Sequence, residues 1–497
     1  MLQAQTIDER RVAIALATPE KRKSELGQFM TPSVIATFMA SMFNPLGKKN
    51  IRLLDAGAGI GSLTAAFAER AAREKAASLQ CEAWEIDGRL HAPLQDTLDI
   101  CASEIRAAGG EFDSTIQVED FIISFSSLFA LEKMTSPTHA ILNPPYKKIH
   151  SASAHRQALR HYGVETANLY SSFVALALKS LADGGELVAI TPRSFCNGTY
   201  FRPFRELLLR NAALVQIHLF ESRTHAFKGD EVLQENVIFH IVKGQKQGSV
   251  ILSSSSDATF SNVVTRLVPF SEIVFLTDKE KIFHLVPGLD SIATTTGMKK
   301  YNNKLEDIGL GVSTGPVVDF RLRAHLRTAS GVGIAPLVYA HHFESGFVSH
   351  PKPDAKKPNY IALNDQTSKW MMSTGFYVCV RRLSSKEEKR RIVPAVFDPA
   401  KVACQIIGFD NHMNVFHSGK KGLPKDVAKG LAVYLGSTFA DQWLRRFSGH
   451  TQVNAGDLRA MRYPDLETLN KWGMQVDGNL PAQEQIDEIV GGIDEQN

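Results

Sequence analysis

Residues Ile51 to Arg70 read IRLLDAGAGIGSLTAAFAER, and this stretch decides the fold class. The apolar run Ile51 to Leu54 predicts a buried β-strand, and the amphipathic end of the stretch predicts a helix. Glycines in the intervening turn let the backbone approach a cofactor, and a helix N-terminus presents free N–H groups. A lone turn of this kind is weak evidence, because NAD sites look similar, but the spacing lacks the dinucleotide pattern G-x-G-x-x-G. It therefore favours a cofactor without a pyrophosphate. The turn residues predicted to bind that cofactor are Asp55, Gly57 and Gly59, followed by Gly61.

Two further predicted strands end in acidic residues at positions that suit a nucleoside. The strand in CEAWEID ends at Glu85, and a strand around Ile116 to Val118 runs into Asp120 and Phe121. Because ligands bind outside the carboxyl ends of the strands in an open α/β sheet, we expect Glu85 to accept hydrogen bonds from ribose hydroxyls. We expect Asp120 to accept from an adenine amino group and Phe121 to pack on the ring. Either carboxylate alone fits a solvated turn, and their order along the chain is what favours binding.

The tetrapeptide Asn143-Pro144-Pro145-Tyr146 follows a short apolar strand, Ala140 to Leu142. A planar amino nitrogen is a poor nucleophile because its lone pair is delocalised. The Asn143 side-chain oxygen and the Pro144 carbonyl can accept hydrogen bonds from such an amino group, and the Tyr146 ring offers a flat face for a base. The prolines fix the backbone direction and remove competing N–H donors. The tetrapeptide thus indicates methylation of an amino nitrogen, with a plain tight turn as the alternative.

With these motifs the chain resembles the S-adenosylmethionine-dependent DNA amino-methyltransferases. The closest likeness is to adenine-N6 enzymes of bacterial type II restriction–modification systems, in the group with cofactor motifs first and target recognition last. The resemblance covers most of the chain and implies S-adenosyl-L-methionine as cofactor. The words LGQFMTP, which end at Pro32, resemble that group's upstream cofactor motif. This motif implies cofactor contacts from Gln28, Thr31 and Pro32. The family resemblance also implies that Asn143 contacts the cofactor.

Later segments extend the resemblance. NVIFHIV, residues Asn236 to Val242, resembles the last strand of the catalytic domain. It implies that Phe239 helps to hold the flipped base, with Phe195 and Phe220 as rivals for that role. Two further segments resemble those that bracket the family's target-recognition region, GVSTGPVVDFR at 311–321 and SGHTQVNAGDLRAMRYP at 448–464.

The order of the predicted elements indicates an α/β fold. Strands and helices alternate from about residue 50 to 243, which predicts a mostly parallel sheet covered on both faces. The resemblance adds a class I methyltransferase, Rossmann-like sheet with a reversed last strand. At 497 residues the chain is long enough for two or three domains. We expect a catalytic and cofactor-binding domain at 1–250, a connecting segment at 251–310, and a mixed target-recognition domain that binds DNA at 311–497.

Composition limits the class of protein. With 44% hydrophobic and 22% charged residues the chain is globular. Its five cysteines show no C-x-x-C spacing, which argues against a zinc site and a disulfide scaffold and favours a reducing compartment. The N-terminus does not resemble a signal peptide, and no window is apolar over 18 residues. We therefore expect a cytoplasmic protein with no membrane partner and no metal.

Positive charge concentrates in the C-terminal half. The net charge of the chain is only +4, but residues 301–475 hold 24 Lys and Arg against 15 Asp and Glu. A solvated face explains any one basic cluster. Their concentration favours contacts with DNA phosphates, which set affinity without reading sequence. The clusters lie at residues 321–327, 352–357, 381–382, 389–391, 420–425 and 445–446.

The expected reaction is methylation of the N6 amino group of an adenine that has been flipped out of duplex DNA. Positioning and exclusion of water dominate, with no strong base and no covalent enzyme intermediate, so the cysteines should be dispensable. The resemblance also implies a separately encoded restriction endonuclease and a target of the CTGCAG kind. We expect a monomer, because methylation of hemimethylated DNA needs only one active site at a time.

Other functions share this tetrapeptide. A protein glutamine-N5 methyltransferase and an RNA guanine-N2 methyltransferase meet the same lone-pair problem, but both leave the basic C-terminal half unexplained. Cytosine-N4 enzymes more often carry Ser in place of Asn143. A modification subunit that relies on a partner for specificity is a further alternative. A fused nuclease is disfavoured because PDLETLNK, at 464–471, lacks the separation that a nuclease motif requires.

Overall fold

The computed structural model divides into two compact units, Met1–Leu289 and Asp290–Asn497. The boundary lies within the stretch predicted as a connection. The residues whose structure is described are 2–19, 22, 30–130, 136–220, 236–275, 278–285, 301–384, 388–402, 404–447 and 452–491.

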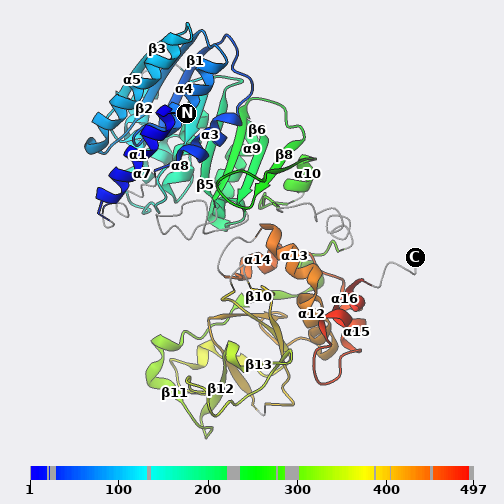
Figure 1. Ribbon diagram of the computed structural model, residues 1–497. Helices are drawn as coiled ribbons and strands as arrows, with labels where there is room; N and C mark the ends of the chain where they lie inside the picture. Colours follow the sequence, from blue (N-terminus) through cyan, green and yellow to red (C-terminus); the bar gives the residue numbers. More distant parts are fainter. Residues whose placement is uncertain are drawn as a thin grey trace. The chain divides into compact units, whose positions relative to one another are not determined.

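The first unit is built on one large sheet (Figure 1). Among the described residues it has nine strands in the order β3-β2-β1-β4-β5-β7-β6-β8-β9. The strands from β3 to β5 are parallel, whereas β7 runs antiparallel to both of its neighbours, β5 and β6. The predicted sheet with a reversed last strand is confirmed. The strands are β1 Asn50–Ala56, β2 Ser78–Trp84, β3 Glu111–Gln117, β4 His139–Leu142, β5 Glu186–Pro192, β6 Ala212–Phe220, β7 Asn236–Lys243, β8 Val250–Ser255 and β9 Val264–Val268.

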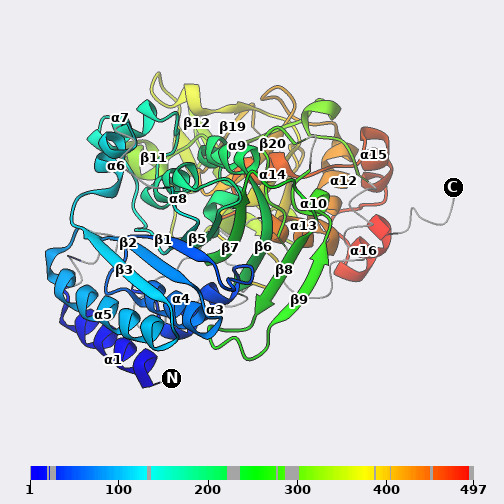
Figure 2. The same cartoon turned by 90° about the horizontal axis from the view of Figure 1, so that it is seen from above.

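Helices cover both faces of this sheet. Figure 2 shows α3, α4 and α5 on one face and α8 and α9 on the other. The 3-10 helices are η1 Gly88–Leu90, η2 Arg193–Cys196 and η3 Thr199–Phe201. The α-helices are α1 Leu2–Ala17, α3 Ser33–Ser41, α4 Ser62–Arg73, α5 His91–Ala107, α6 Phe121–Ala130, α7 Ala154–His161, α8 Leu169–Ser180, α9 Arg202–Asn211 and α10 Phe270–Ile273.

Two hydrophobic cores result, one on each face of the sheet. Successive side chains of a strand point to opposite faces, so Leu53 of β1 packs in the core with Phe67 of α4, and Leu54 packs in the core with Val174 of α8. The central strands β4 and β5 are buried at every position. Strands covered on both faces are mainly apolar, which explains the apolar runs in the sequence. The buried Glu186 of β5 is an exception, and it pairs with His240 of β7.

The prediction of a connecting segment at 251–310 needs correction. Strand β8 pairs parallel with β6, and β9 pairs antiparallel with β8, so both extend the large sheet. The Gly/Ser-rich composition of Gly244 to Asn262 had favoured a linker or an exposed hairpin. In β8, however, Ser253 and Ser255 hydrogen-bond the two ring nitrogens of the buried His218 on β6. Because these hydroxyl groups have a hydrogen-bond partner on β6, a serine-rich strand can be buried in the sheet.

The second unit combines two sheets with a group of helices. Among the described residues, one sheet has the order β10-β20-β17-β18-β14-β13 and the other the order β11-β15-β12-β19-β16. The strands are β10 Gly311–Thr314, β11 Leu326–Arg327, β12 Ile334–Val338, β13 Phe343–Glu344, β14 Phe347–Val348, β15 Tyr360–Ala362, β16 Met372–Ser373, β17 Tyr377–Arg381, β18 Pro394–Phe397, β19 Ile406–Phe409 and β20 Met413–His417. The helices are η4 Glu306–Ile308, η5 Asp319–Arg321, η6 Arg323–His325, η7 Ala340–His342, η8 Ser368–Trp370, α12 Lys425–Gly436, α13 Thr438–Phe447, α14 Ala455–Ala460, α15 Leu466–Gly473 and α16 Gln483–Gly491.

In the part of the chain that the structure describes, no helix is long and apolar enough to cross a membrane.

Helices α12 and α15 of the second unit approach each other at two glycines. A Cβ atom on Gly430 would lie 1.8 Å from the Leu469 carbonyl oxygen, and one on Gly473 would lie 1.7 Å from the Asp426 carbonyl oxygen. Since the obstacles are backbone atoms, a side chain here would push the helices apart.

We predict that Gly430→Ala lowers the free energy of unfolding by about 1–3 kcal/mol, because overpacking outweighs the higher helix propensity of alanine. Gly491→Ala is the matched control, since its Cβ would meet no atom within 4 Å. Urea unfolding measures both. A Gly430→Ala protein as stable as the control would contradict the close approach.

Candidate active site

The glycine turn joins β1 to α4. Gly57, Gly59 and Gly61 have φ angles of 83°, 60° and 84°, in the left-handed region that favours glycine. At Gly61 space is also short, because a Cβ would meet Leu94 Cδ1 at 2.9 Å. The turn therefore follows a path that other residues would strain, and it leads into the N-terminus of α4.

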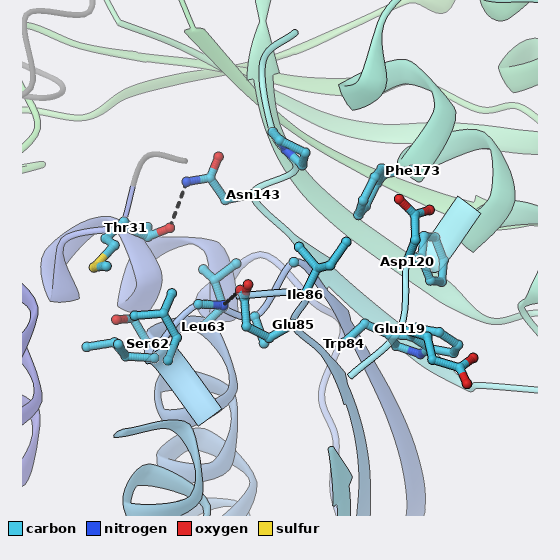
Figure 3. A pocket seen from close by; sticks show the side chains of 18 residues that line it. Thr31, Ser62, Leu63, Trp84, Glu85, Ile86, Glu119, Asp120, Asn143 and Phe173 are labelled. Carbon is cyan, nitrogen blue, oxygen red and sulfur yellow. Dashed lines mark hydrogen bonds between the residues drawn. The ribbon is translucent and has the colours of Figure 1, made fainter. Parts of the chain in front are cut away.

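A pocket opens beside this turn, at the carboxyl ends of the parallel strands (Figure 3). The empty volume of the pocket is about 840 Å³, including open solvent at its mouth. The residues that line it are Met30, Thr31, Gly57, Ala58, Gly59, Ile60, Ser62, Leu63, Trp84, Glu85, Ile86, Leu90, Glu119, Asp120, Phe121, Asn143, Pro145 and Phe173.

Glu85 lines the pocket at the end of β2 and braces the glycine turn. Its Oε2 accepts a hydrogen bond of 2.8 Å from the Gly59 N–H, and its Oε1 accepts one of 2.7 Å from the Asp87 N–H. The side chain is 4% exposed, and burial raises its pKa against the lowering effect of these bonds. A carboxylate oxygen can accept more than one hydrogen bond, so the predicted contact with ribose hydroxyls remains compatible with this geometry.

Asp55 behaves differently from the prediction. It is fully buried and does not line the pocket. Its Oδ2 accepts a 2.7 Å hydrogen bond from the Thr64 hydroxyl of α4, and its Oδ1 has no hydrogen-bond partner among the described residues. Burial raises the pKa of Asp55 to about 7. The prediction that Asp55 contacts the cofactor directly is therefore wrong. Its side chain instead links the end of β1 to α4 through Thr64.

Asp120 and Phe121 both line the pocket, after β3. Asp120 Oδ1 accepts hydrogen bonds from the N–H groups of Ile122 and Ile123, so it caps α6, and Oδ2 lies 2.7 Å from His155 Nε2. Burial alone would raise the pKa of Asp120, but the bond to His155 and the N–H groups lower it. The sequence did not single out His155. Phe121 packs edge-on against Trp84 at 5.3 Å between ring centroids.

The tetrapeptide leaves β4 at the edge of the same pocket. Asn143 Nδ2 donates a 2.9 Å hydrogen bond to the Thr31 hydroxyl, and the Tyr146 hydroxyl donates one of 3.1 Å to Asn143 Oδ1 (Figure 3 shows the first). Two partners thus fix the orientation of the amide. Burial raises the pKa of Tyr146, so its hydroxyl stays protonated and remains a donor.

The other predicted residues divide between the site and the core. Thr31 lines the pocket and Pro32 stands at the N-terminal end of α3. Pro144 is buried. Gln28 lies outside the described residues.

The role expected of Phe239 disagrees with the structure. Phe239 is 1% exposed on β7, and its ring centroid lies 5.5 Å from that of Phe195 within the core. Its rivals Phe195 and Phe220 are 1% and 7% exposed. Because β7 lies between β5 and β6 with helices on both faces, its side chains meet core atoms and not the pocket. The prediction for Phe239 is therefore corrected to a core residue.

Several apolar pocket residues were missed by the sequence analysis. Ile86 keeps 54% exposure although it is a large apolar side chain, and it directly follows Glu85. That adjacency is a signal that could have identified it. Phe173 projects from α8, far away in sequence, and no local pattern marks it.

The strand order with a reversed β7, the glycine turn after β1 and the pocket at the carboxyl ends of the strands define the class I methyltransferase fold. A family model described as Eco57I restriction-modification methylase matches residues 139–227. The chain is 46% identical to the type II methyltransferase M.BsuBI of Bacillus subtilis, over 97% of this chain and 96% of that protein. It is 43% identical to the type II methyltransferase M.PstI of Providencia stuartii, over 97% and 96% of the two chains. The chain therefore belongs to the type II methyltransferases of restriction–modification systems.

Among solved structures, the cryo-EM structure of a DrdV–DNA complex is similar at 12% identity with a TM-score of 0.48. The matched region covers 95% of this chain and 59% of the DrdV chain.

Protonation of Asp55 should make stability depend on pH. Between about pH 4 and 7 the folded protein holds a proton on Asp55 that the unfolded chain has released, so the free energy of unfolding falls as pH rises through this window. Asp55→Asn removes the titration. We predict that wild type loses on the order of 1 kcal/mol or more relative to this variant between pH 5 and 7.

The measurement is urea unfolding at several pH values, with Asp113→Asn, at an exposed position of β3, as the control. Equal pH slopes for wild type and Asp55→Asn would show that Asp55 is not protonated in this window.

Proposed function

We propose that this protein transfers a methyl group from S-adenosyl-L-methionine to the N6 amino group of an adenine in duplex DNA, at a specific site. The modification would protect that site from a separately encoded restriction endonuclease. The observation that carries the proposal is the position of Asn143. It lines the pocket, and hydrogen bonds from Tyr146 and to Thr31 hold its amide in one orientation.

The pocket residues fit a nucleoside with a sulfonium-bearing amino-acid tail. Glu85 offers carboxylate oxygens for ribose hydroxyls at the end of β2. Ile86, Leu63 and Phe121 provide apolar surface for the flat faces of an adenine ring. Gly57 and Gly59 of the turn line the pocket, and their lack of side chains lets a ligand approach the backbone. When bound there, S-adenosyl-L-methionine supplies the electrophilic methyl group.

The tetrapeptide is suited to hold the target amino group. Because Asn143 Nδ2 donates to Thr31, Oδ1 is the amide atom that can accept a hydrogen bond from a substrate amino group. The Pro144 carbonyl is the second acceptor. Two such acceptors orient the two N–H bonds, and the lone pair then points away from both of them. Positioning in a site without bulk water is the expected source of rate enhancement.

No side chain is assigned as a covalent catalyst. Cys81, Cys101, Cys196 and Cys379 are buried, and Cys404 lies in the second unit. Burial raises the pKa of Cys101 to about 12, so its thiol is a poor nucleophile at neutral pH.

The finer features of the proposal rest on resemblance. Asn143, where cytosine-N4 enzymes more often carry Ser, favours adenine. The overall likeness favours a six-base palindromic target of the CTGCAG kind. The pocket and the tetrapeptide both lie in the first unit of one chain, which supports a monomeric enzyme. The basic second unit supports duplex DNA as substrate over a protein. The proposed DNA substrate is in keeping with a cytoplasmic location.

Replacement of Asn143 tests the proposal. We predict that Asn143→Ala lowers transfer of labelled methyl groups to unmethylated plasmid DNA by about 100-fold or more, the scale for loss of one preorganised hydrogen-bonding group at a reacting centre. Asn211→Ala, at an exposed position at the end of α9, is the matched control and should retain activity.

Two outcomes would contradict the proposal. Label on RNA or on a protein but not on DNA would reassign the substrate. No transfer to any of the three by wild type would favour a subunit that needs a partner.

In the proposed mechanism the Tyr146 hydroxyl holds Asn143 and the Tyr146 ring stacks on the target base. Two variants distinguish these contributions. Tyr146→Phe removes the donor to Asn143 Oδ1 and keeps the ring, whereas Tyr146→Ala removes both. We predict that kcat falls by about tenfold for Phe, as expected from loss of one hydrogen bond of about 1.4 kcal/mol, and by considerably more for Ala. Steady-state methylation kinetics measure both. Full activity of Tyr146→Phe would show that the hydroxyl is not needed to hold Asn143.

A further inference from the structure

The basic clusters of the second unit differ in what their side chains do. Three clusters are engaged inside the unit. Arg391 is fully buried and Arg446 is 5% exposed. Arg445 Nε lies 2.7 Å from Asp441 Oδ2, and Arg381 forms an ion pair with Glu388. The arginines of the clusters at 381–382, 389–391 and 445–446 are therefore engaged within the unit, whereas Lys389 is exposed.

A different group of cations lies on the surface around β11 and β15. Arg321, Arg323, Arg327 and Lys356 are exposed, and none of them forms an ion pair with another described residue. We call these four residues, together with Lys357, the β11–β15 basic strip. Lys357 pairs with Asp319, and Arg327 also donates hydrogen bonds to the Ala324 and Leu326 carbonyls. The positive charge of the four exposed residues is not neutralised by a carboxylate of the described part of the chain.

The fold brings the two halves of the strip together from distant parts of the sequence. Lys357 Nζ lies 2.7 Å from Asp319 Oδ2, two residues before Arg321. Strand pairing adds a second link, because Arg327 of β11 is opposite Tyr360 of β15. The strip is thus one surface and not two separate solvated runs.

Two cations of this strip form cation–π contacts with aromatic rings. The Arg321 guanidinium lies 5.5 Å from the ring centroid of Phe320, which is 56% exposed, and Lys357 Nζ lies 4.6 Å from that of Tyr339. Such contacts restrict the side chains before a ligand arrives. Three of the five residues are arginines, whose planar fork of donors matches phosphate oxygens.

We propose that the β11–β15 basic strip is the surface of the second unit that contacts the phosphate backbone of duplex DNA. This inference rests on the proposed function and adds where the second unit binds its substrate. The strip fixes affinity and register, and it carries no base readout itself. Arg321, Arg323 and Arg327 each neutralise a phosphate, which releases counterions and makes binding dependent on salt.

The cluster at 420–425 is the rival surface and supplies a matched control. Lys420, Lys421 and Lys425 are also exposed and without an ion pair among the described residues. Strand β20 begins beside Asp410, which pairs with Val317 near the strip, and it ends at His417. The lysine cluster comes just after the His417 end of β20. In the described part of the unit, none of its three lysines lies over an aromatic ring.

The test compares two triple variants of the full chain that remove equal charge. Arg321→Ala/Arg323→Ala/Arg327→Ala and Lys420→Ala/Lys421→Ala/Lys425→Ala are titrated against a labelled duplex that wild type methylates, by fluorescence anisotropy from 50 to 200 mM salt. We expect the arginine variant to bind at least about tenfold more weakly. Its slope of log affinity against log salt should fall by about 0.9 for each lost phosphate contact, so by up to about 3. The lysine variant should stay within about threefold of wild type.

Several outcomes would overturn the inference. An arginine variant with the wild-type slope, or a lysine variant with the larger loss, would reject the strip and leave the proposed function intact. Failure of wild type to bind or methylate any duplex would reject both. Binding of S-adenosylhomocysteine to the first unit and thermal unfolding check that each variant is folded. If the triple arginine variant does not fold, the single variants replace it, each with an expected drop of about 1 in the salt slope.

Discussion

The hydrogen bonds that hold the Asn143 amide are the constraint on which the site depends. A side-chain amide can present either its oxygen or its nitrogen to a substrate, and only the oxygen can accept from an amino group. Thr31 takes the nitrogen end, and the Tyr146 hydroxyl binds the oxygen. These partners come from the segment before α3 and from the tetrapeptide itself, so the correct orientation exists only when both segments are in place beside β4.

The sheet provides that placement. Parallel strands bring their carboxyl ends to one edge, and at this edge Glu85 after β2 binds the Gly59 N–H of the turn after β1. The same edge carries Asp120 after β3 and Asn143 after β4. Each of these strands is followed by a polar residue that lines the pocket. The sheet fixes the positions of these residues. We propose that exposed arginines of the second unit meet the phosphates of DNA, whereas buried or ion-paired cations such as Arg391 and Arg445 belong to the fold of the unit itself.

The sequence predicted those features that depend on local order along the chain. The strand–glycine turn–helix unit, Glu85 at a strand end and Asn143 after an apolar run all lie where the pattern indicated. Predictions failed where the direction of a side chain depends on distant neighbours. Asp55 turns toward Thr64 and away from the pocket, and Phe239 enters the core because β7 is a central strand. His155 and Phe173 reach the pocket region from helices whose positions no local pattern fixes. The place of β8 in the large sheet was not predicted, because its serines bond a buried histidine on β6 that no local pattern marks.

The most direct test of the central claim is the chemical identity of the product. Plasmid DNA incubated with wild type and S-adenosylmethionine is digested to nucleosides and measured by mass spectrometry, with Asn143→Ala as the control. The proposed function predicts N6-methyldeoxyadenosine as the product with wild type, and the proposed acceptor role of Asn143 predicts that this product is absent with the variant. N4-methyldeoxycytidine, or equal amounts of N6-methyldeoxyadenosine from wild type and variant, would contradict the roles assigned to this site.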